Sequence, residues 1–535
     1  MMIEPWRLCF KCEIKKIKIE VSYLSNFQGV PKSTNVKSVV SVIDTLKSYE
    51  YVDNGQPMRG GMKDVYFSPD RTYVVAFYRD KQDYNSKERL RKIVTQYYDS
   101  FFNRDGGTYY KELYCWPTDM VEKDGKVGLI VPAYNQNFFF KKGYAGSDGI
   151  KGKEKQGLWF ASAKFRNKGF SLRLDSSELG TWLNYFQICV RIARGVKRLH
   201  AAGLAHSDLS YKNVLVDPVS KSATIIDIDG LVVPGLYPPD VIGTADFIAP
   251  EVLATKHLDI RDPNRKHANR TTDLHALAVM IYMYLLYRHP LKGGKVNSLD
   301  TEQDDLLSMG EKALFIEHPN DTSNRPKMKQ VSKWALPWAD IVKLPYTITG
   351  PYLKELFEHA FIKGLHHPNL RPNADTWEQA LLKTTDLMQP CNNKSCEQKW
   401  FVFDNTAAPR CPFCGTPVQG PLPVLDLYYE FKPTVWKPEH HRLMVCHNQY
   451  LFQWHVNRNI VRNEKLTTEQ KVPVAYFTFH HGKWVLVNQK LHSLKDLTED
   501  REIPPGTMVD ITDGKRLLLS KDDGGRIVLI TMTNK

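Results

Sequence analysis

The sequence predicts an α+β fold built in successive parts, on three observations. From Asn54 to Tyr134, short apolar runs alternate with Gly, Pro and Asp turns, which is typical of antiparallel strands. From about residue 179 to 388, apolar residues recur at helical spacing over long amphipathic segments. After residue 420 the pattern returns to strands and turns. We therefore expect a β-rich lobe, an α-rich lobe and a C-terminal all-β domain.

The first lobe is expected to follow an N-terminal extension of residues 1–40 and to open with a helix over Ser41 to Tyr51. The next residues, NGQPMRGGMKDVYFSPDRTYVVAFYRD, predict a strand, a glycine-rich turn, a strand, a Pro-Asp turn and a strand. Lys87 to Phe102 is periodic enough for a helix, and two further strands surround the turn at 123–126. Val131 to Tyr134 then links the two lobes.

The second lobe is predicted from its helices. Asp273 precedes one apolar run directly, so it is placed as a helix cap. Between the lobes, Lys141 to Phe170 holds eight Lys and Arg residues against two acidic ones, and this favours an exposed insertion over a nucleic-acid site. The expected helices cover residues 179–202, 274–287, 352–364 and 376–388.

Most of the candidate chemistry lies in LAHSDLSYKNVLVDPVSKSATIIDIDG, residues 204–230. Asp208 lies two residues after His206 and five before Asn213, so one loop can present a carboxylate to a hydroxyl and an amide oxygen to a metal ion. Asp227 follows an apolar pair, which suits a carboxylate that binds Mg²⁺, and Asp229 is the ligand if the register is shifted. The alternative is a polar turn that matches by chance.

These loops resemble the catalytic and metal-binding loops of the protein-kinase superfamily. Two further matches follow in the family's order, GTADFIAPE from Gly243 to Glu251 and LRP at 370–372. The resemblance implies a bilobal kinase fold over 41–390, with a small lobe to about 135 and a large lobe after it. It also implies an ion pair between Glu251 and Arg371, and an Asp273 side chain that holds the catalytic loop.

The resemblance implies a protein serine/threonine kinase that uses ATP with Mg²⁺ or Mn²⁺. Asp208 would be the base, Asn213 and Asp227 the metal ligands, and Lys212 the cation that neutralises the transferred phosphoryl group. Ser207 replaces the arginine of the family's H-R-D, so switching by loop phosphorylation is not expected.

Thr244 is the single Ser or Thr from Asp227 to Glu251, and it is expected to contact Asp208 or the substrate hydroxyl.

The nucleotide-binding part departs from the family. Gly60 and Gly61 can approach phosphate oxygens, but the lysine expected two residues after Ala76 is replaced by Tyr78. Lys63, in the glycine-rich turn, is the predicted substitute, and the alternative is a surface lysine. Its predicted partner is Glu88, on the next helix. The other predicted nucleotide contacts are Ala76, Val131 and Ala133.

Four cysteines follow the last helix with C-x4-C and C-x2-C spacing, which predicts a structural Zn²⁺ ribbon over 391–420. Disulfides are the alternative. The separate pair Cys9 and Cys12 has no second pair nearby, and an incidental role is favoured for it. The four predicted zinc ligands are Cys391, Cys396, Cys411 and Cys414.

Residues 421–535 alternate apolar and polar positions between Gly-containing turns, which predicts a β-sandwich. The string KWVLVNQKLHSLKDL faintly resembles the last strands of forkhead-associated domains, which bind phosphothreonine. Because their anion-binding positions are not recognisable here, a sandwich that docks proteins is the favoured interpretation.

Composition limits the class of protein. The net charge of +14, from 73 basic and 59 acidic residues, is diffuse and favours acidic partners, although a nucleic-acid role is not expected. No stretch is apolar enough for a membrane span, and the N-terminus lacks the apolar region of a signal peptide, so a cytoplasmic protein is expected.

The combination of loops and ribbon is similar to that of bacterial kinases in tellurite-resistance phosphorylation triads. That resemblance implies a TerY-type von Willebrand protein and a PPM-type phosphatase as partners. Two alternatives remain open, namely a pseudokinase scaffold that binds nucleotide and docks partners through the ribbon and β domain, and a small-molecule kinase, which would lack the GTADFIAPE element.

Overall fold

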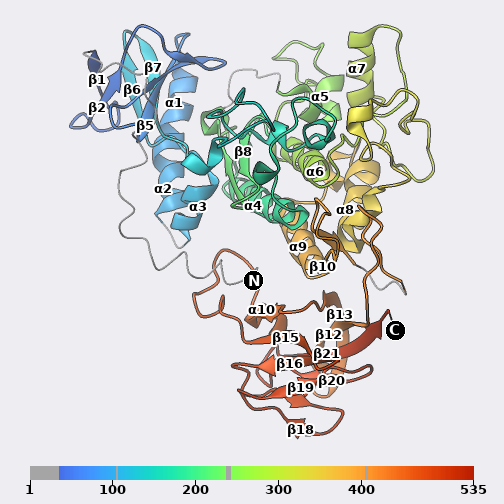
Figure 1. Ribbon diagram of the computed structural model, residues 1–535. Coiled ribbons are helices and arrows are strands. Elements are labelled where there is room, and N and C mark those ends of the chain that lie inside the picture. Colours follow the sequence, from blue (N-terminus) through green and yellow to red (C-terminus); the bar gives the residue numbers. More distant parts are fainter. Residues whose placement is uncertain (1–34, 104–105, 237–242, 404–407, 535) are drawn as a thin grey trace.

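The computed structural model describes residues 35–103, 106–236, 243–403 and 408–534. Figure 1 shows two lobes at the top, with a separate β domain below them that contains the C-terminal end. The predicted extension lies mostly outside the described residues, and Cys9 and Cys12 lie wholly outside them. Among the described residues, no helix is both long enough and apolar enough to cross a membrane.

The small lobe is built on a five-stranded antiparallel sheet in the order β3-β4-β5-β7-β6. Successive residues of β5 point to opposite faces of this sheet. Val75 and Phe77 pack on one face, and Tyr78 packs with Leu90 and Val94 on the other. The expected order of strands and turns is confirmed. The strands are β3 (Met58–Arg59), β4 (Lys63–Phe67), β5 (Tyr73–Tyr78), β6 (Asp119–Lys123) and β7 (Lys126–Pro132).

The predicted helix over Lys87 to Phe102 is also present, as α1 (Tyr84–Lys92), one π-helical turn and α2 (Tyr98–Phe102). Asp83 caps α1, because its side chain accepts a hydrogen bond from the Ser86 N–H. A short helix, α3 (Gly107–Leu113), leads back to the sheet. The helix α1 therefore lies against the sheet, facing the large lobe through its last turns.

The helix predicted over Ser41 to Tyr51 is wrong. The chain forms a hairpin of β1 (Val36–Val40) and β2 (Ser48–Val52), with Val39 and Tyr51 buried against the small-lobe sheet. Val and Tyr favour strands, and burial of alternate side chains overrides the weak helical spacing. The small lobe thus includes Val36–Val40, which had been assigned to the extension.

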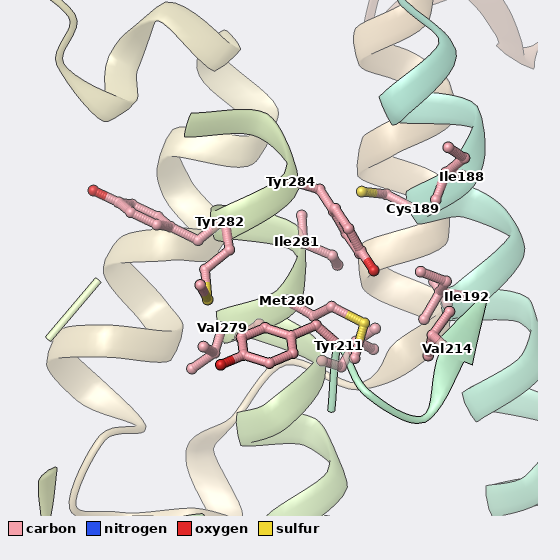
Figure 2. Packing of buried hydrophobic residues seen from close by; sticks show 14 of the residues in the cluster. Ile188, Cys189, Ile192, Tyr211, Val214, Val279, Met280, Ile281, Tyr282 and Tyr284 are labelled. Carbon is pink, nitrogen blue, oxygen red and sulfur yellow. The ribbon is translucent and has the colours of Figure 1, made fainter. Parts of the chain in front are cut away.

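Two long helices, α4 (Trp182–Ala201) and α6 (Arg270–Leu286), form the centre of the large lobe. Every residue of α6 from Ala276 to Leu286 is buried, and Figure 2 shows Met280 and Tyr284 of α6 facing Cys189 and Ile192 of α4. The predicted helices are therefore confirmed. The remaining elements are β8 (Val214–Asp217), β9 (Ser222–Ile225), α5 (Pro250–Ala254), α7 (Thr301–Met309), α8 (Pro351–Glu358) and α9 (Ala374–Thr385).

Two predictions about the large lobe need correction. The basic segment Lys141 to Phe170 is not simply an exposed insertion, because Phe160 is fully buried and Lys155 is buried in ion pairs with Glu178 and Asp217. Glycines and lysines in the sequence concealed this apolar anchoring. At the start of α6 the capping side chain belongs to Asn269, which accepts from the Thr271 N–H, and not to Asp273.

The C-terminal part begins with a small hairpin of β10 (Met388–Pro390) and β11 (Trp400–Val402), followed by two antiparallel sheets that share one core. The predicted turns are confirmed by the left-handed φ of Gly482, Gly506, Gly514 and Gly524. One sheet contains β12 (Leu422–Lys432), β13 (Val435–Met444), β17 (Lys495–Asp496), β18 (Arg501–Glu502), β20 (Arg516–Leu518) and β21 (Arg526–Thr533). The other contains β14 (Tyr450–Leu451), β15 (Ala475–His480), β16 (Lys483–Asn488) and β19 (Met508–Asp510), with the short α10 (Gln453–Val456) between β14 and β15.

This C-terminal part packs on the large lobe. The Phe413 ring contacts Trp182 of α4, with centroids 4.9 Å apart. Asp386, just after α9, accepts a hydrogen bond of 2.7 Å from His441 of β13. The cysteine segment and the β domain are thus attached to the base of the large lobe.

Candidate active site

The hairpin β8–β9 brings the two predicted metal ligands to one end of the large lobe. Val214 pairs with Ile225, so Asn213, just before β8, lies beside Ile226, just after β9. The Ile226 N–H donates to the Asn213 carbonyl at 3.0 Å, and Asp227 follows at once with a left-handed φ of 61°. The two candidate ligand side chains therefore emerge from neighbouring backbone positions.

Asp208 joins them through its own hydrogen bonds. The Asn213 side-chain NH₂ donates to the Asp208 carboxylate at 2.9 Å and to its carbonyl at 2.8 Å. This leaves the side-chain oxygen of Asn213 as the atom that can bind a cation. The Thr244 N–H donates to the other carboxylate oxygen of Asp208 at 2.8 Å, which confirms the predicted contact between these residues.

The loop that carries Asp208 is fixed from below. The carboxylate of Asp273 is buried and accepts from the His206 N–H at 2.9 Å and from the His200 ring at 3.0 Å. The His206 ring in turn contacts the Ile226 carbonyl at 2.9 Å, which ties this loop to the segment carrying Asp227. Asp273 is thus the anchor that the resemblance implied, although it does not cap the helix.

Two other side chains of the loop are placed as follows. Ser207 has a left-handed φ of 60°, and its hydroxyl donates to the Gly230 carbonyl at 2.7 Å, which links the loop of Asp208 to the loop of Asp227. Lys212 is exposed and lies four residues after Asp208 on the same loop.

The predicted pair of Glu251 and Arg371 is confirmed and is bidentate. The two nitrogens of the Arg371 guanidinium donate to the two carboxylate oxygens at 2.8 and 2.7 Å. Arg371 is buried and also donates to the carbonyls of Gly364 and Thr271. The segment after Thr244 is thereby fixed to the start of α6, in the way that a planar fork of donors allows.

In the small lobe, Gly60 and Gly61 form the tight turn between β3 and β4. The Gly60 N–H donates to the Lys63 carbonyl at 2.9 Å, and Gly61 has open space where a side chain would project. The Arg79 guanidinium donates to the carbonyls of both glycines and lies 3.6 Å from Asp64. Arg79 therefore supports the turn from outside instead of replacing the missing lysine.

Lys63 lies where it can replace that lysine. In the β4–β5 ladder it is the direct partner of Tyr78, the residue found at the expected lysine position. Residues directly opposite in neighbouring strands share one face of the sheet. Its ammonium group is 2.5 Å from Asp229 and 3.4 Å from Asp227, so it reaches across to the large lobe.

Asp229 is the counter-ion of this lysine. It is buried, and it accepts hydrogen bonds from Lys63 and from the Tyr78 hydroxyl. Burial alone would raise the pKa of Asp229, but the charge of Lys63 and these hydrogen bonds outweigh it and hold the pKa below its usual value. Burial would lower the pKa of Lys63, but Asp229 and Asp227 raise it above the usual value.

Asp227 behaves differently from its neighbour. Burial and the charge of Asp229 raise the pKa of Asp227, and Lys63 only partly offsets them. Its side chain remains half exposed, while that of Asp229 is 8% exposed. A half-exposed carboxylate with an unfavourable neighbour is well suited to a divalent cation, which would relieve the repulsion.

The predicted pairing of Lys63 with Glu88 is wrong. Glu88 lies 3.9 Å from Arg91 on its own helix, and the next residue, Arg89, is the one that faces the site. The buried Arg89 guanidinium donates to the backbone carbonyls of Asp229 and Leu231. The helix α1 therefore holds the loop of Asp227 and Asp229 through the loop's backbone, and the acidic partner of Lys63 comes from that loop.

The other predicted nucleotide contacts lie on β5, on β7 and just after β7. Ala76 is buried in β5, opposite Val65 and Leu129. Val131 pairs with Val74, and the Ala133 N–H already donates to the Thr72 carbonyl at 2.9 Å. A base bound through the N–H of Ala133 would have to displace that contact.

Sequence reasoning missed the roles of Asp229, Arg89 and Tyr78 as a network. Asp229 was considered only as a metal ligand in a shifted register. The available indication was Asp229, an acidic residue at a position where the family has glycine.

The four predicted zinc ligands come together. Each offers a sulfur atom, and all four atoms lie within 4.8 Å of one another, with Cys391 to Cys414 at 3.5 Å and Cys396 to Cys411 at 3.9 Å. Thiolates around a tetrahedral Zn²⁺ at about 2.3 Å are about 3.8 Å apart. The arrangement fits one zinc ion, and all four cysteines are free thiols.

Comparison with known proteins relates part of this chain to protein kinases. Residues 175–345 match the protein kinase domain family. The dual serine/threonine and tyrosine protein kinase of Apis mellifera is 28% identical over 109 residues, covering 20% of this chain and 10% of its own. The serine/threonine-protein kinase ppk21 of Schizosaccharomyces pombe is 27% identical over 168 residues, covering 26% and 28%.

A third relative, the serine/threonine-protein kinase PSK1 of Saccharomyces cerevisiae, is 30% identical over 148 residues, covering 25% of this chain and 10% of the relative. This chain thus spans between about a tenth and just over a quarter of the length of these relatives. The class of enzyme that the matches support is a protein serine/threonine kinase.

Proposed function

We propose that this protein transfers the γ-phosphoryl group of ATP to Ser or Thr hydroxyls of a protein partner. The observation that carries the proposal is the joint placement of Asp208, Asn213 and Asp227 on one loop and one hairpin end, with Lys63 reaching them from the small lobe. Phosphoryl transfer depends mainly on positioning and on charge stabilisation, and these side chains offer both.

In this proposal each residue has a definite task. Asp208, oriented by Asn213 and by the Thr244 N–H, accepts the proton of the attacking hydroxyl. Lys63 holds phosphate oxygens of the nucleotide, and Lys212 lies close to the group that is transferred. Asn213 and Asp227 offer the oxygen ligands that Mg²⁺ or Mn²⁺ prefers, and a cation held there would neutralise phosphate charge.

The remaining proposed nucleotide contacts lie on or next to the strands of the small-lobe sheet. The turn at Gly60 and Gly61 would cover the phosphates, and Ala76, Val131 and Ala133 would line the adenine site. This assignment is supported by their place in the sheet that carries Lys63, because Ala76 lies on β5 between Tyr78, the partner of Lys63, and Val74, the partner of Val131.

The C-terminal part is proposed to serve docking. Four thiolates would hold a structural Zn²⁺, which would keep the small hairpin and the Phe413 contact in place. The β domain would bind a protein partner. A von Willebrand-type protein and a PPM-type phosphatase are the proposed partners, on the resemblance of the loops and ribbon to triad kinases.

A pseudokinase scaffold is the second candidate, because the lysine of the β5 strand is absent. The intact trio of Asp208, Asn213 and Asp227 and the position of Lys63 favour the enzyme.

The test uses the full chain with Mg²⁺ or Mn²⁺, γ-labelled ATP and protein substrates, and compares the wild type with Asp208→Asn. We expect transfer by the wild type and a loss of about 10³-fold in the variant, because a general base typically contributes 10²–10⁴-fold. ATP binding without transfer, unchanged by Asp208→Asn, would favour the scaffold.

A further inference from the structure

A hollow beside Asp208 is lined by apolar and basic residues, and we call it the acceptor groove. Its floor is apolar and is formed by Phe247, Ile248, Val252 and Leu253, from the segment just before α5 and from α5 itself. Asp208 also lines the groove. A peptide bound there would present a hydroxyl to Asp208 and lay its neighbouring residues along the groove.

The lining of the groove also contains three cationic residues, Lys256, Arg265 and Lys266. After α5 the chain makes a loop and returns, and the Lys266 N–H donates to the Thr255 hydroxyl at 2.9 Å. This contact brings Lys256 and Lys266 to one edge, although they are ten residues apart in the sequence, and both line the groove with exposed side chains. Arg265 lines it too, and its guanidinium donates to the Leu258 carbonyl.

Among the residues that the structure describes, the acidic groups around the groove do not neutralise the charges of Lys256 and Lys266. Its lining contains two carboxylates, of which Asp208 bonds to Asn213 and Thr244 while Asp273 is buried beneath the catalytic loop. The same loop contains Asp259 and Asp262, but they are outside the lining, and their side chains accept from the N–H groups of Arg261 and Asn264. Residues 256–270 hold five Lys and Arg against these two Asp.

We propose that the acceptor groove selects acidic substrates, meaning protein segments with Asp or Glu close to the Ser or Thr that is phosphorylated. The inference rests on the proposed function and adds the substrate class to it. Lys256 and Lys266 are the residues that would determine specificity, by contacting substrate carboxylates beyond the apolar floor. The net charge of +14 would attract the same substrates at long range.

The test measures kcat/KM of the full-length protein on three synthetic peptides of equal length with one Thr. The neighbours of the Thr on both sides are Glu in the first peptide, Ala in the second and Lys in the third. The protein is compared with Lys256→Glu/Lys266→Glu and with a control of equal net charge, Lys471→Glu/Lys490→Glu, at exposed positions of the β domain.

We expect the wild type to prefer the Glu peptide over the Ala peptide by about threefold to tenfold, the range for two or three exposed charge pairs. Lys256→Glu/Lys266→Glu should abolish this preference or reverse it toward the Lys peptide, and the control should retain it. Added salt should also reduce the preference.

Two results would overturn the inference. An active wild type that treats the Glu and Ala peptides alike would reject the substrate class while leaving the proposed function intact. Retention of the preference in Lys256→Glu/Lys266→Glu, or its equal loss in the control, would show that the groove edge is not its source. Transfer to none of the peptides nor to any protein, with ATP bound, would reject the proposed function and this inference together.

Discussion

The large-lobe half and the small-lobe half of the candidate site are assembled in different ways. Asp208, Asn213 and Asp227 come from one loop and one hairpin, and their mutual contacts join residues at most about twenty positions apart. In the small lobe, Lys63 contacts Asp229, which is 166 positions away. The family match also begins only at residue 175, so it includes the first half and not the second.

This difference indicates which part of the site can be supplied from another position in the sequence. In the proposed function, Asp208, Asn213 and Asp227 must converge on one cation and one hydroxyl, and they do so from a loop and a hairpin end that hydrogen bonds join directly. A phosphate-binding ammonium group needs only to reach the cleft, so it can come from either of two paired strands. Lys63 and Tyr78 are such partners, and Asp229 supplies the carboxylate that α1 does not.

The largest expected effect distinguishes Lys63 from a surface lysine. Lys63→Ala should lower kcat/KM for ATP in phosphate transfer by about 10²–10³-fold, as expected when one preorganised charge donor is removed. Lys81→Ala is the matched control, because Lys81 is exposed after β5 with its side chain near Gly125. Equal activity of the two variants would mean that the small lobe has no substitute lysine.

An intermediate effect concerns stability. Asp229→Asn leaves the ammonium group of Lys63 without its main counter-ion, so the free energy of unfolding should fall by about 2 kcal/mol, the usual value of a hydrogen bond to a charged group. Urea denaturation measures it, and Asp124→Asn, in the exposed turn between β6 and β7, is the control. A change no larger than that of the control would exclude a stabilising ion network.

The smallest expected effect is a pH dependence of the free energy of unfolding that arises in the large lobe and not at Lys63. His289 is buried below the segment of Asp246, and burial lowers its pKa from 6.5 to about 4. Its ring contacts the Asp246 carbonyl and accepts from the Leu291 N–H, so the neutral form is bound. The unfolded chain therefore takes up more protons between pH 6.5 and 4, and stability falls as pH falls through this range.

From this group alone, the free energy of unfolding at pH 5.5 should be about 1 kcal/mol lower than at pH 7. His289→Gln should lose this part of the pH dependence, whereas His492→Gln, at an exposed position, should keep it. Lys63 and Asp229 stay charged across the same range, because the pKa of the lysine is raised and that of the carboxylate is lowered. An unchanged pH dependence in His289→Gln would contradict the buried neutral ring.

The sequence was sufficient for the parts of the fold with local patterns. The helix α6 was predicted from its apolar run, which is buried from Ala276 to Leu286, and the four cysteines were grouped from their spacing alone. The pair of Glu251 and Arg371 was predicted as well, because both residues lie in recognisable strings.

What the sequence did not provide depends on contacts between distant segments. Glu88 and Arg89 are neighbours on α1, and a shift of one residue along a helix decides which of them faces the site. The hairpin β1–β2 was taken for a helix because the burial of Val39 and Tyr51 against the sheet is not visible in the local spacing. Lys155 was counted as exposed because its partners, Glu178 and Asp217, are far along the chain.

The most direct test of the account relocates the lysine. Because Lys63 and Tyr78 are direct partners across β4 and β5, Tyr78→Lys should place an ammonium group on the same face when Lys63 is replaced by Ala. In an assay of phosphate transfer from labelled ATP, Lys63→Ala/Tyr78→Lys should be at least about tenfold more active than Lys63→Ala. Full activity of Lys63→Ala, or no recovery in a folded double variant that still binds ATP, would contradict it.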